Sequence, residues 1–283
     1  MVENKLTILV KKNEDKIGFL EDSLYSLTLI KEIKFEVVIV SESSTDEELI
    51  QLIEKMSNYF TISIYKSKFK NVLDRFNEAL TNVENEYALL IDDSTVILPD
   101  LNFLIKELKD KKELNLAYGD IKASKLRLKN SEFYTYTKEL RRIDTNLNKF
   151  DLIFNPVLYL EACLFRTESF NTAEFDKNFH YYQRWKFIKD ILLKDNSKIL
   201  HVEKFVVLVN KLDKDKNFEA EDFSVKEKEL IWDEIYTKGI SLIGDDLKSL
   251  KEKFDRFKDQ KVLESSLGIK KEMKNFIKRV IKK

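Results

Sequence analysis

Apolar and polar residues follow a regular order over about the first 120 residues. Short apolar runs of strand length alternate with segments whose apolar residues recur every three or four positions, as on one face of a helix. Strands are predicted at residues 6–10, 35–40, 61–65, 87–91 and 114–118. Strands that alternate with helices favour a mostly parallel, twisted sheet with helices on both faces, so the sequence predicts an α/β fold.

The intervening helices have recognisable starting residues. One begins near Ile17, and a second follows a turn in which Ser44 or Thr45 is expected to cap the helix ahead of two glutamates. A third is predicted at residues 71–83, and Pro99 is expected to start a fourth.

The pattern is less regular after residue 120. Residues 121–160 lack a steady period and predict an extended crossover with a loop over the sheet, whereas residues 199–209 predict another strand. The second half of residues 175–193 has helical spacing, and residues 223–257 predict one or two further helices. We therefore expect a main domain at residues 1–210 and a C-terminal helical extension at residues 211–283.

The strand at residues 87–91 runs directly into Asp92, Asp93 and Ser94. In open α/β sheets, ligands bind beyond the carboxyl ends of the strands. A buried strand that ends in two carboxylates and a hydroxyl therefore indicates a binding site, with a solvated acidic turn as the alternative.

Composition excludes several classes of function. Lys plus Arg and Asp plus Glu number 50 each, so no net charge attracts nucleic acid. One cysteine and two histidines provide neither an internal disulfide nor a Cys/His zinc cluster. The five glycines form no phosphate-binding loop of the dinucleotide or P-loop kind. Because neither a signal-peptide core nor a run of 18 apolar residues occurs, we expect a cytoplasmic protein.

Several motifs occur at spacings that resemble family 2 glycosyltransferases of the GT-A fold. The resemblance covers about residues 5–210, and it rests on the turn Ser41 to Asp46, on Arg75 and Asn77, Glu86-Tyr87, Asp92-Asp93-Ser94, Tyr118-Gly119-Asp120, Phe165-Arg166, Phe175-Asp176 and Phe179. It implies a GT-A-like sheet followed by C-terminal helices, and a role in bacterial glycan or glycoconjugate assembly.

The resemblance also implies where ligands bind. A nucleotide diphosphate sugar is expected over the strand ends, and its binding residues would be Val10, Ser41, Glu42, Asn71, Arg75, Asp92 and Asp93. A Mn²⁺ or Mg²⁺ ion would be held at Asp92 and Ser94, and the general base would lie at Gln183-Arg184. The acceptor would be a glycan or a protein.

The departures from the family pattern fall on the residues that carry its chemistry. Ser41 replaces a carboxylate that contacts the nucleobase, and Ser94 replaces the last carboxylate of the metal motif, so the ion would be weakly bound. Arg184 replaces the general base, and a guanidinium cannot accept a proton. Since a positioned base contributes about 10²- to 10⁴-fold in rate, we predict a non-catalytic or very slow protein, a pseudo-glycosyltransferase with a binding or scaffolding role.

Two alternatives stay open. An active inverting glycosyltransferase would need another base, with Arg184 holding the diphosphate leaving group. A scaffold would bind an active glycosyltransferase or a second copy of the chain.

Residues 267–283 form a basic amphipathic segment. Six apolar residues share one helical face, and seven Lys and Arg residues lie on the other against the single acid Glu272. Such a segment suits an anionic membrane surface and predicts peripheral attachment at the inner face of the membrane. Docking on the domain or on a partner chain is the alternative.

Overall fold

The fold is described from a computed structural model. The chain divides into two compact units, Met1–Asp233 and Glu234–Lys283, and the description below concerns the first. The structure describes residues 5–12, 17–41, 46–124, 127–129, 132–134, 139–141, 152–153, 158–170, 173–180, 182–193, 198–210, 227, 230–231 and 233–235. The predicted membrane-binding segment at 267–283 and most of the predicted helices at 223–257 lie outside these residues. The predicted domain boundary at residue 210 stays a prediction.

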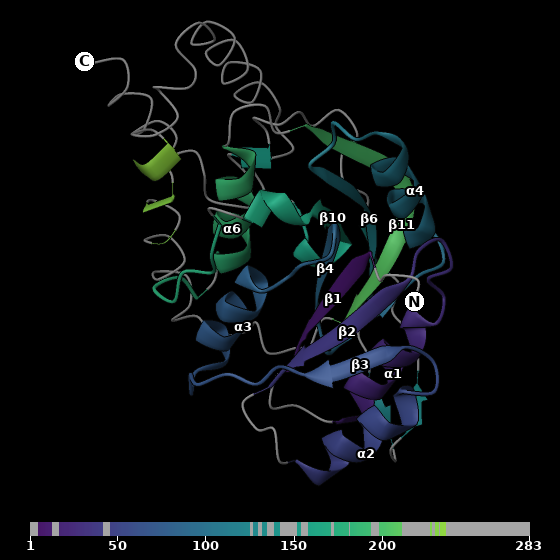
Figure 1. Cartoon of the computed structure of the whole chain (residues 1–283). Helices are drawn as coiled ribbons and strands as arrows, with labels where there is room; N and C mark the ends of the chain where they lie inside the picture. The colour runs from purple at the N-terminus through teal and green to yellow at the C-terminus, as the bar shows by residue number, and fades with distance from the viewer. Residues whose placement is uncertain are drawn as a thin grey trace, which may run out of the picture. The chain divides into compact units, whose positions relative to one another are not determined.

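A nine-stranded sheet forms the centre of the described chain, with strand order β3-β2-β1-β4-β10-β6-β11-β5 and β9 paired with β6 (Figure 1). Its strands are β1 (Leu6–Lys11), β2 (Phe35–Val40), β3 (Thr61–Ile64), β4 (Tyr87–Asp92), β5 (Thr95–Ile97), β6 (Leu116–Ser124), β9 (Glu139–Arg141), β10 (Cys163–Arg166) and β11 (Ile199–Asn210). The pairings give β1, β2, β3, β4, β6 and β11 one direction and β5, β9 and β10 the opposite one. The predicted α/β fold with a mostly parallel sheet is therefore confirmed.

Helices cover the two faces of the sheet in separate groups. Helices α1 (Ile17–Leu27), α2 (Glu47–Met56) and α4 (Leu101–Asp110) pack on the larger core, whereas α3 (Val72–Thr81) and α6 (Gln183–Leu192) lie together on the other side (Figure 1). The larger core takes alternate residues of the central strands, such as Leu89 and Ile91 of β4. The residues that alternate with them along the strand, Leu90 and Asp92, therefore face the opposite side of the sheet, toward α3 and α6.

Side-chain caps fix the starts of two helices near the strand ends. Asp46 accepts hydrogen bonds from the backbone N–H groups of Glu48 and Leu49 at 3.1 and 3.3 Å, so Asp46 caps α2 rather than Ser44 or Thr45. Asn71 caps α3 in the same way, through the N–H groups of Leu73 and Asp74. These bonds satisfy N–H groups that the first helical turn leaves without partners.

The structure differs from the predicted elements at several points. The strand expected at 114–118 is β6, which begins at Leu116 and continues to Ser124, because both β10 and β11 pair with it. The short strand β5 follows β4 after a two-residue turn and pairs with β11, a long-range contact that its three residues do not reveal. Helix α4 begins at Leu101, two residues after Pro99. Within 121–160, the strands β7 (Arg127–Lys129) and β8 (Glu132–Tyr134) form a hairpin.

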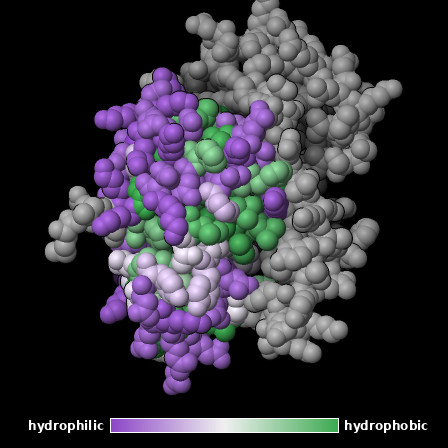
Figure 2. Space-filling view, turned by 90° about the vertical axis from the view of Figure 1, so that its right-hand side faces the viewer, coloured by the Kyte–Doolittle hydropathy of each residue, from purple (hydrophilic) through white to green (hydrophobic). Residues whose placement is uncertain are grey.

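The outer surface over α4 is mostly polar. Figure 2 looks at the side that carries this helix, and hydrophilic residues there surround a smaller apolar area. Helix α4 contributes to the polarity, because Leu101, Leu104, Ile105 and Leu108 are buried against the sheet and only Phe103 among its apolar residues is exposed. No helix of the described residues has the length and apolar character needed to cross a bilayer.

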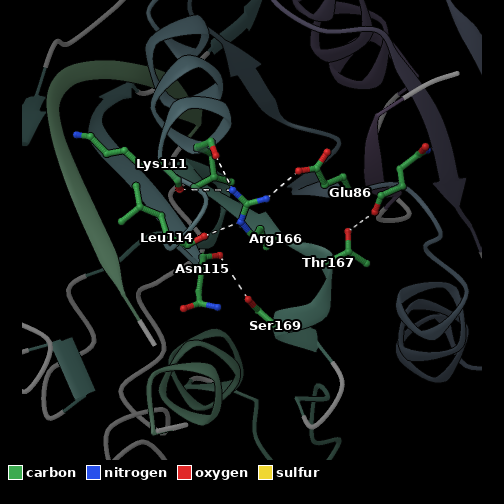
Figure 3. Close-up of polar contacts among 9 residues, drawn as sticks. Glu86, Lys111, Leu114, Asn115, Arg166, Thr167 and Ser169 are labelled. Atoms are coloured by element: carbon green, nitrogen blue, oxygen red, sulfur yellow. Dashed lines mark hydrogen bonds and ion pairs between the residues drawn. The ribbon is translucent and has the colours of Figure 1, made fainter. Parts of the chain in front are cut away.

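Arg166, at the end of β10, is a buried structural cation (Figure 3). Its guanidinium donates to the carbonyl oxygens of Leu108 at 2.6 Å and Leu114 at 2.8 Å, and it pairs with the Glu86 carboxylate at 2.8 Å. A fourth, longer contact reaches the carbonyl of Lys111 at 3.4 Å. Arg166 therefore caps the C-terminus of α4, where the helix dipole favours a positive charge.

Candidate functional site

A pocket lies where β1 and β4 end, between α3 and α6. Its polar lining consists of Lys11, Asp92, Glu161, Gln183 and Arg184. Its apolar lining consists of Leu73, Phe76, Leu90, Ile91, Leu160 and Phe175. The β4 turn predicted to carry a site thus lies at a small pocket that combines charged groups with apolar and aromatic walls.

Arg184 lies between two carboxylates in this pocket. One guanidinium nitrogen donates to Asp92 Oδ2, and the other donates to Glu161 Oε1. The Arg184 side chain is 43% exposed, whereas that of Glu161 is 2% exposed. The guanidinium therefore joins a strand end to a buried acid and still reaches the open part of the pocket.

Glu161 is positioned by the short helix η1 (Leu160–Ala162), which leads into β10. Burial raises the pKa of the Glu161 carboxyl, because water no longer stabilises the ionised form, and Arg184 opposes this effect. The same neighbours raise the pKa of Arg184, first through the charge of Glu161. Arg184 is thus a permanent cation at this site.

Helix α6 is held so that its first turn faces the pocket. The rings of Phe175 and Phe187 stack with their centroids 4.3 Å apart, and the Gln183 amide donates to the carbonyl oxygens of Asp176 and Phe179 at 3.1 and 3.0 Å. Asn77 of α3 bonds both the N–H and the carbonyl of Phe175, each at 2.8 Å. These contacts fix the position of Arg184 relative to α3.

A carboxylate from the C-terminal part of the same unit caps this helix. Glu227 accepts from the N–H groups of His180 at 2.7 Å and Tyr182 at 3.0 Å, and Tyr182 directly precedes α6. Tyr182 makes no side-chain cap of its own. Since an anion near a helix N-terminus is favourable, Glu227 stabilises the start of the helix that carries Arg184.

Comparisons with solved structures identify the fold. S. aureus TarS, as its 1–349 fragment, superposes with a TM-score of 0.57 at 16% identity, over 89% of this chain and 78% of that one. The same fragment bound to UDP-GlcNAc gives 0.56. The mannosyltransferase PcManGT from Pyrobaculum calidifontis, bound to GDP-Man and Mn²⁺, gives 0.53 at 13% identity, over 75% of this chain and 58% of that one. The chain has the GT-A glycosyltransferase fold. No protein-family model and no curated protein sequence matches it.

Within this GT-A fold, the residues predicted to bind nucleotide occupy different environments. Val10 is buried in the larger core, and the neighbouring Lys11 lines the pocket instead. Ser41 is buried, and its carbonyl accepts a hydrogen bond from Arg75. Arg75 also donates to the carbonyl of Phe69, so it connects the end of β2 to the loop before α3.

Three further residues were predicted to bind nucleotide. The Asn71 side chain caps α3, and Glu42 lies outside the described residues. Asp93 is buried, and its N–H donates to the carbonyl of Lys11 at 3.1 Å. Of the predicted binding and catalytic residues, Asp92, Gln183 and Arg184 are the ones that the structure brings into one pocket.

The predicted metal position does not fit a divalent ion in this arrangement. Asp92 Oδ2 already accepts from the Arg184 guanidinium, and Ser94 offers only a neutral hydroxyl. Among the described residues, no three His, Cys, Asp or Glu side chains are grouped to hold a metal ion. Mn²⁺ and Mg²⁺ need several oxygen ligands, preferably charged ones, and a bound guanidinium would repel them.

Glu161 and Lys11 are the charged residues of this site that the sequence motifs did not identify. Glu161 stands as a single acid inside the apolar run Leu158 to Phe165. A charge within such a run is a signal, because buried acids are rare unless they are paired. The partner, Arg184, lies 23 residues away in the sequence.

The raised pKa of Glu161 predicts a pH effect on stability. The unfolded chain loses this proton near pH 4.3, whereas the folded protein retains it to a higher pH. Between the two pKa values the unfolded state binds fewer protons, so the free energy of unfolding falls as pH rises. Glu161→Gln should lack this decrease. Urea titrations from pH 4 to pH 8 should therefore show the variant gaining stability relative to the native protein as pH rises, and parallel curves would contradict the assignment.

Proposed function

We propose that the protein binds a nucleotide diphosphate sugar in this pocket as a pseudo-glycosyltransferase, with little or no transfer activity. The observation that supports it best is the Arg184 guanidinium held between Asp92 and Glu161 at the strand ends. A guanidinium fork suits phosphate oxygens, and Lys11 adds a second cation to the same pocket. The solved neighbours support this ligand class, because TarS was solved with UDP-GlcNAc and PcManGT with GDP-Man.

The composition of the pocket argues against ordinary turnover. At the position where the family pattern has a general base, Arg184 cannot accept a proton. Its neighbour Gln183 is neutral, and its amide is engaged with two backbone carbonyls. We therefore expect Arg184 to take the role that a divalent ion has elsewhere, which is to balance the charge of a diphosphate.

Calorimetry with the native protein tests this proposal. UDP, GDP and their glucose, N-acetylglucosamine and mannose conjugates should be titrated with and without Mn²⁺, while release of the nucleoside diphosphate is measured in parallel. We expect at least one conjugate to bind, with an affinity that Mn²⁺ changes less than about threefold, and no measurable release. Failure of every compound to bind would overturn the proposal.

A second candidate function, an active inverting glycosyltransferase, is favoured by Glu161. This carboxyl lies in the pocket, and burial raises its pKa, which is a property of general bases. If a diphosphate drew Arg184 away, Glu161 would lose its counter-ion and would accept a proton more readily. Turnover by the native protein that is lost in both Glu161→Gln and Arg184→Ala would establish this alternative.

A further inference from the structure

One oxygen atom in the pocket has no hydrogen-bond partner. Among the described residues, the buried side-chain atoms without such a partner are Ser23 Oγ, Thr95 Oγ1, Glu107 Oε2 and Glu161 Oε2. Glu107 Oε2 nevertheless lies 2.6 Å from the Lys111 ammonium, so its charge is balanced. Glu161 Oε2 belongs to the one carboxylate of this group that lines the pocket.

Burial makes this oxygen informative. A buried polar atom that loses its water and gains no partner costs about 1–3 kcal/mol, and more when the group is charged. Native proteins therefore satisfy almost all such atoms, and an exception at a pocket points to a ligand or an ordered water. Glu161 Oε1 is fixed by Arg184, which leaves Oε2 as the atom of this carboxylate with bonding capacity to spare.

We infer that Glu161 Oε2 accepts a hydrogen bond from a hydroxyl group of the bound sugar. This inference rests on the proposed function and adds to it the residue that distinguishes a nucleotide sugar from a bare nucleotide. Glu161 becomes the polar anchor of the sugar, while Arg184 and Lys11 hold the diphosphate.

The charges of the pocket favour a neutral donor at this oxygen. Lys11 and Arg184 are the cationic side chains of the lining, and Asp92 and Glu161 are its two carboxyl groups. A phosphate placed against Glu161 would be repelled, so the anionic part of the ligand belongs at Lys11 and at the exposed side of the Arg184 guanidinium, away from the buried carboxylate. A hydroxyl group donates a hydrogen bond to a carboxylate without adding charge, and a sugar ring carries several hydroxyl groups.

Apolar side chains form the walls of the pocket beside Glu161. Phe76 and Phe175 pack edge to face with their ring centroids 5.4 Å apart, and Leu90 and Leu160 add apolar surface. The C–H groups of a sugar can pack against such walls while its hydroxyls meet a few polar atoms. A carboxylate oxygen in an otherwise apolar wall orients the sugar, because the wall offers few other polar atoms that could form hydrogen bonds with the sugar hydroxyls.

Substitution of one atom tests the inference. Glu161→Gln preserves the size of the side chain, and its amide oxygen can still accept from Arg184. The amide NH₂ then replaces Oε2, so a hydrogen-bond acceptor becomes a donor. The matched control is Glu107→Gln, the same change at the other buried carboxylate oxygen, which belongs to α4 and does not line the pocket.

The readout is the ratio of two dissociation constants, that of the nucleoside diphosphate over that of its sugar conjugate, measured by calorimetry at pH 8. A change in the contact between Arg184 and the diphosphate affects both dissociation constants, so it cancels in their ratio. We expect it to fall about 10- to 100-fold in Glu161→Gln, the range for a hydrogen bond to a charged group, and to stay within twofold in Glu107→Gln. An unchanged ratio in Glu161→Gln would overturn the inference.

A second measurement uses the native protein and does not depend on the folding of a variant. Conjugates in which single sugar hydroxyls are replaced by hydrogen or fluorine cannot donate this hydrogen bond. At one hydroxyl position, either replacement should weaken the binding affinity about tenfold or more. Equal affinities for all analogues would overturn the inference. If nucleotides and conjugates bind but neither the ratio nor the analogue affinities change as expected, only the role of Glu161 is refuted. If no compound binds, the proposed function is refuted, and this inference with it.

Discussion

Replacement of Arg166 by Ala is expected to lower the free energy of unfolding by about 3–5 kcal/mol, the range found when one partner of a buried charge pair is removed. The side chain is 8% exposed, and its guanidinium satisfies main-chain carbonyls of α4 and of the segment that follows. Without it, these buried oxygens lose their donors, and the C-terminus of α4 loses its cap. Urea denaturation followed by circular dichroism measures the change.

The control for this prediction is Glu86→Gln. Glu86 is 45% exposed and meets Arg166 through one ion pair, so its loss should cost at most about 1 kcal/mol. Because the carbonyl contacts of Arg166 remain in this variant, the difference between the two variants isolates the capping role. Equal losses in both variants would mean that the ion pair, and not the cap, carries the stability.

Replacement of Arg184 by Ala is expected to create Mn²⁺ dependence in a pocket that we propose binds its ligand without Mn²⁺. Asp92 and Glu161 would face each other without the cation that separates them, and two carboxylates are a better site for a divalent ion than one carboxylate beside a guanidinium. Without metal, nucleotide affinity should fall about tenfold or more. With 1 mM Mn²⁺, the variant should gain several degrees in melting temperature, whereas the native protein should gain little.

Arg184→Lys is the matched control, since it retains a positive charge between the same carboxylates. It should resemble the native protein in its indifference to Mn²⁺, although a point charge replaces the bidentate fork. The measurement is differential scanning calorimetry with and without Mn²⁺ for the three proteins. A native protein that Mn²⁺ stabilises as much as Arg184→Ala would contradict the view that Arg184 occupies the cation position.

Local patterns predicted the order of the elements because that order depends on periodicity. The apolar run predicted at residues 87–91 forms β4 (Tyr87–Asp92) in the interior of the sheet, and the helical spacing after Asn71 becomes α3. Strand β5 was missed, since three residues are too few to show a period and their pairing partner lies more than a hundred positions away. The extension of β6 to Ser124 was missed for the same reason, because β11 stabilises it from a distant part of the chain.

The sequence by itself determined the alternation of strands and helices and the chemical identity of residue 184, because periodicity and side-chain type are local properties; the GT-A plan was an expectation from the resemblance to family 2 glycosyltransferases. Only the tertiary structure decided what Arg184 does. It shows the guanidinium paired with Asp92, whose motif was recognised, and with Glu161, whose role was not. The physical reason is that burial and charge pairing depend on residues from three elements, β4, η1 and α6, that become neighbours only in the folded chain. A local sequence pattern contains no information about such a long-range contact.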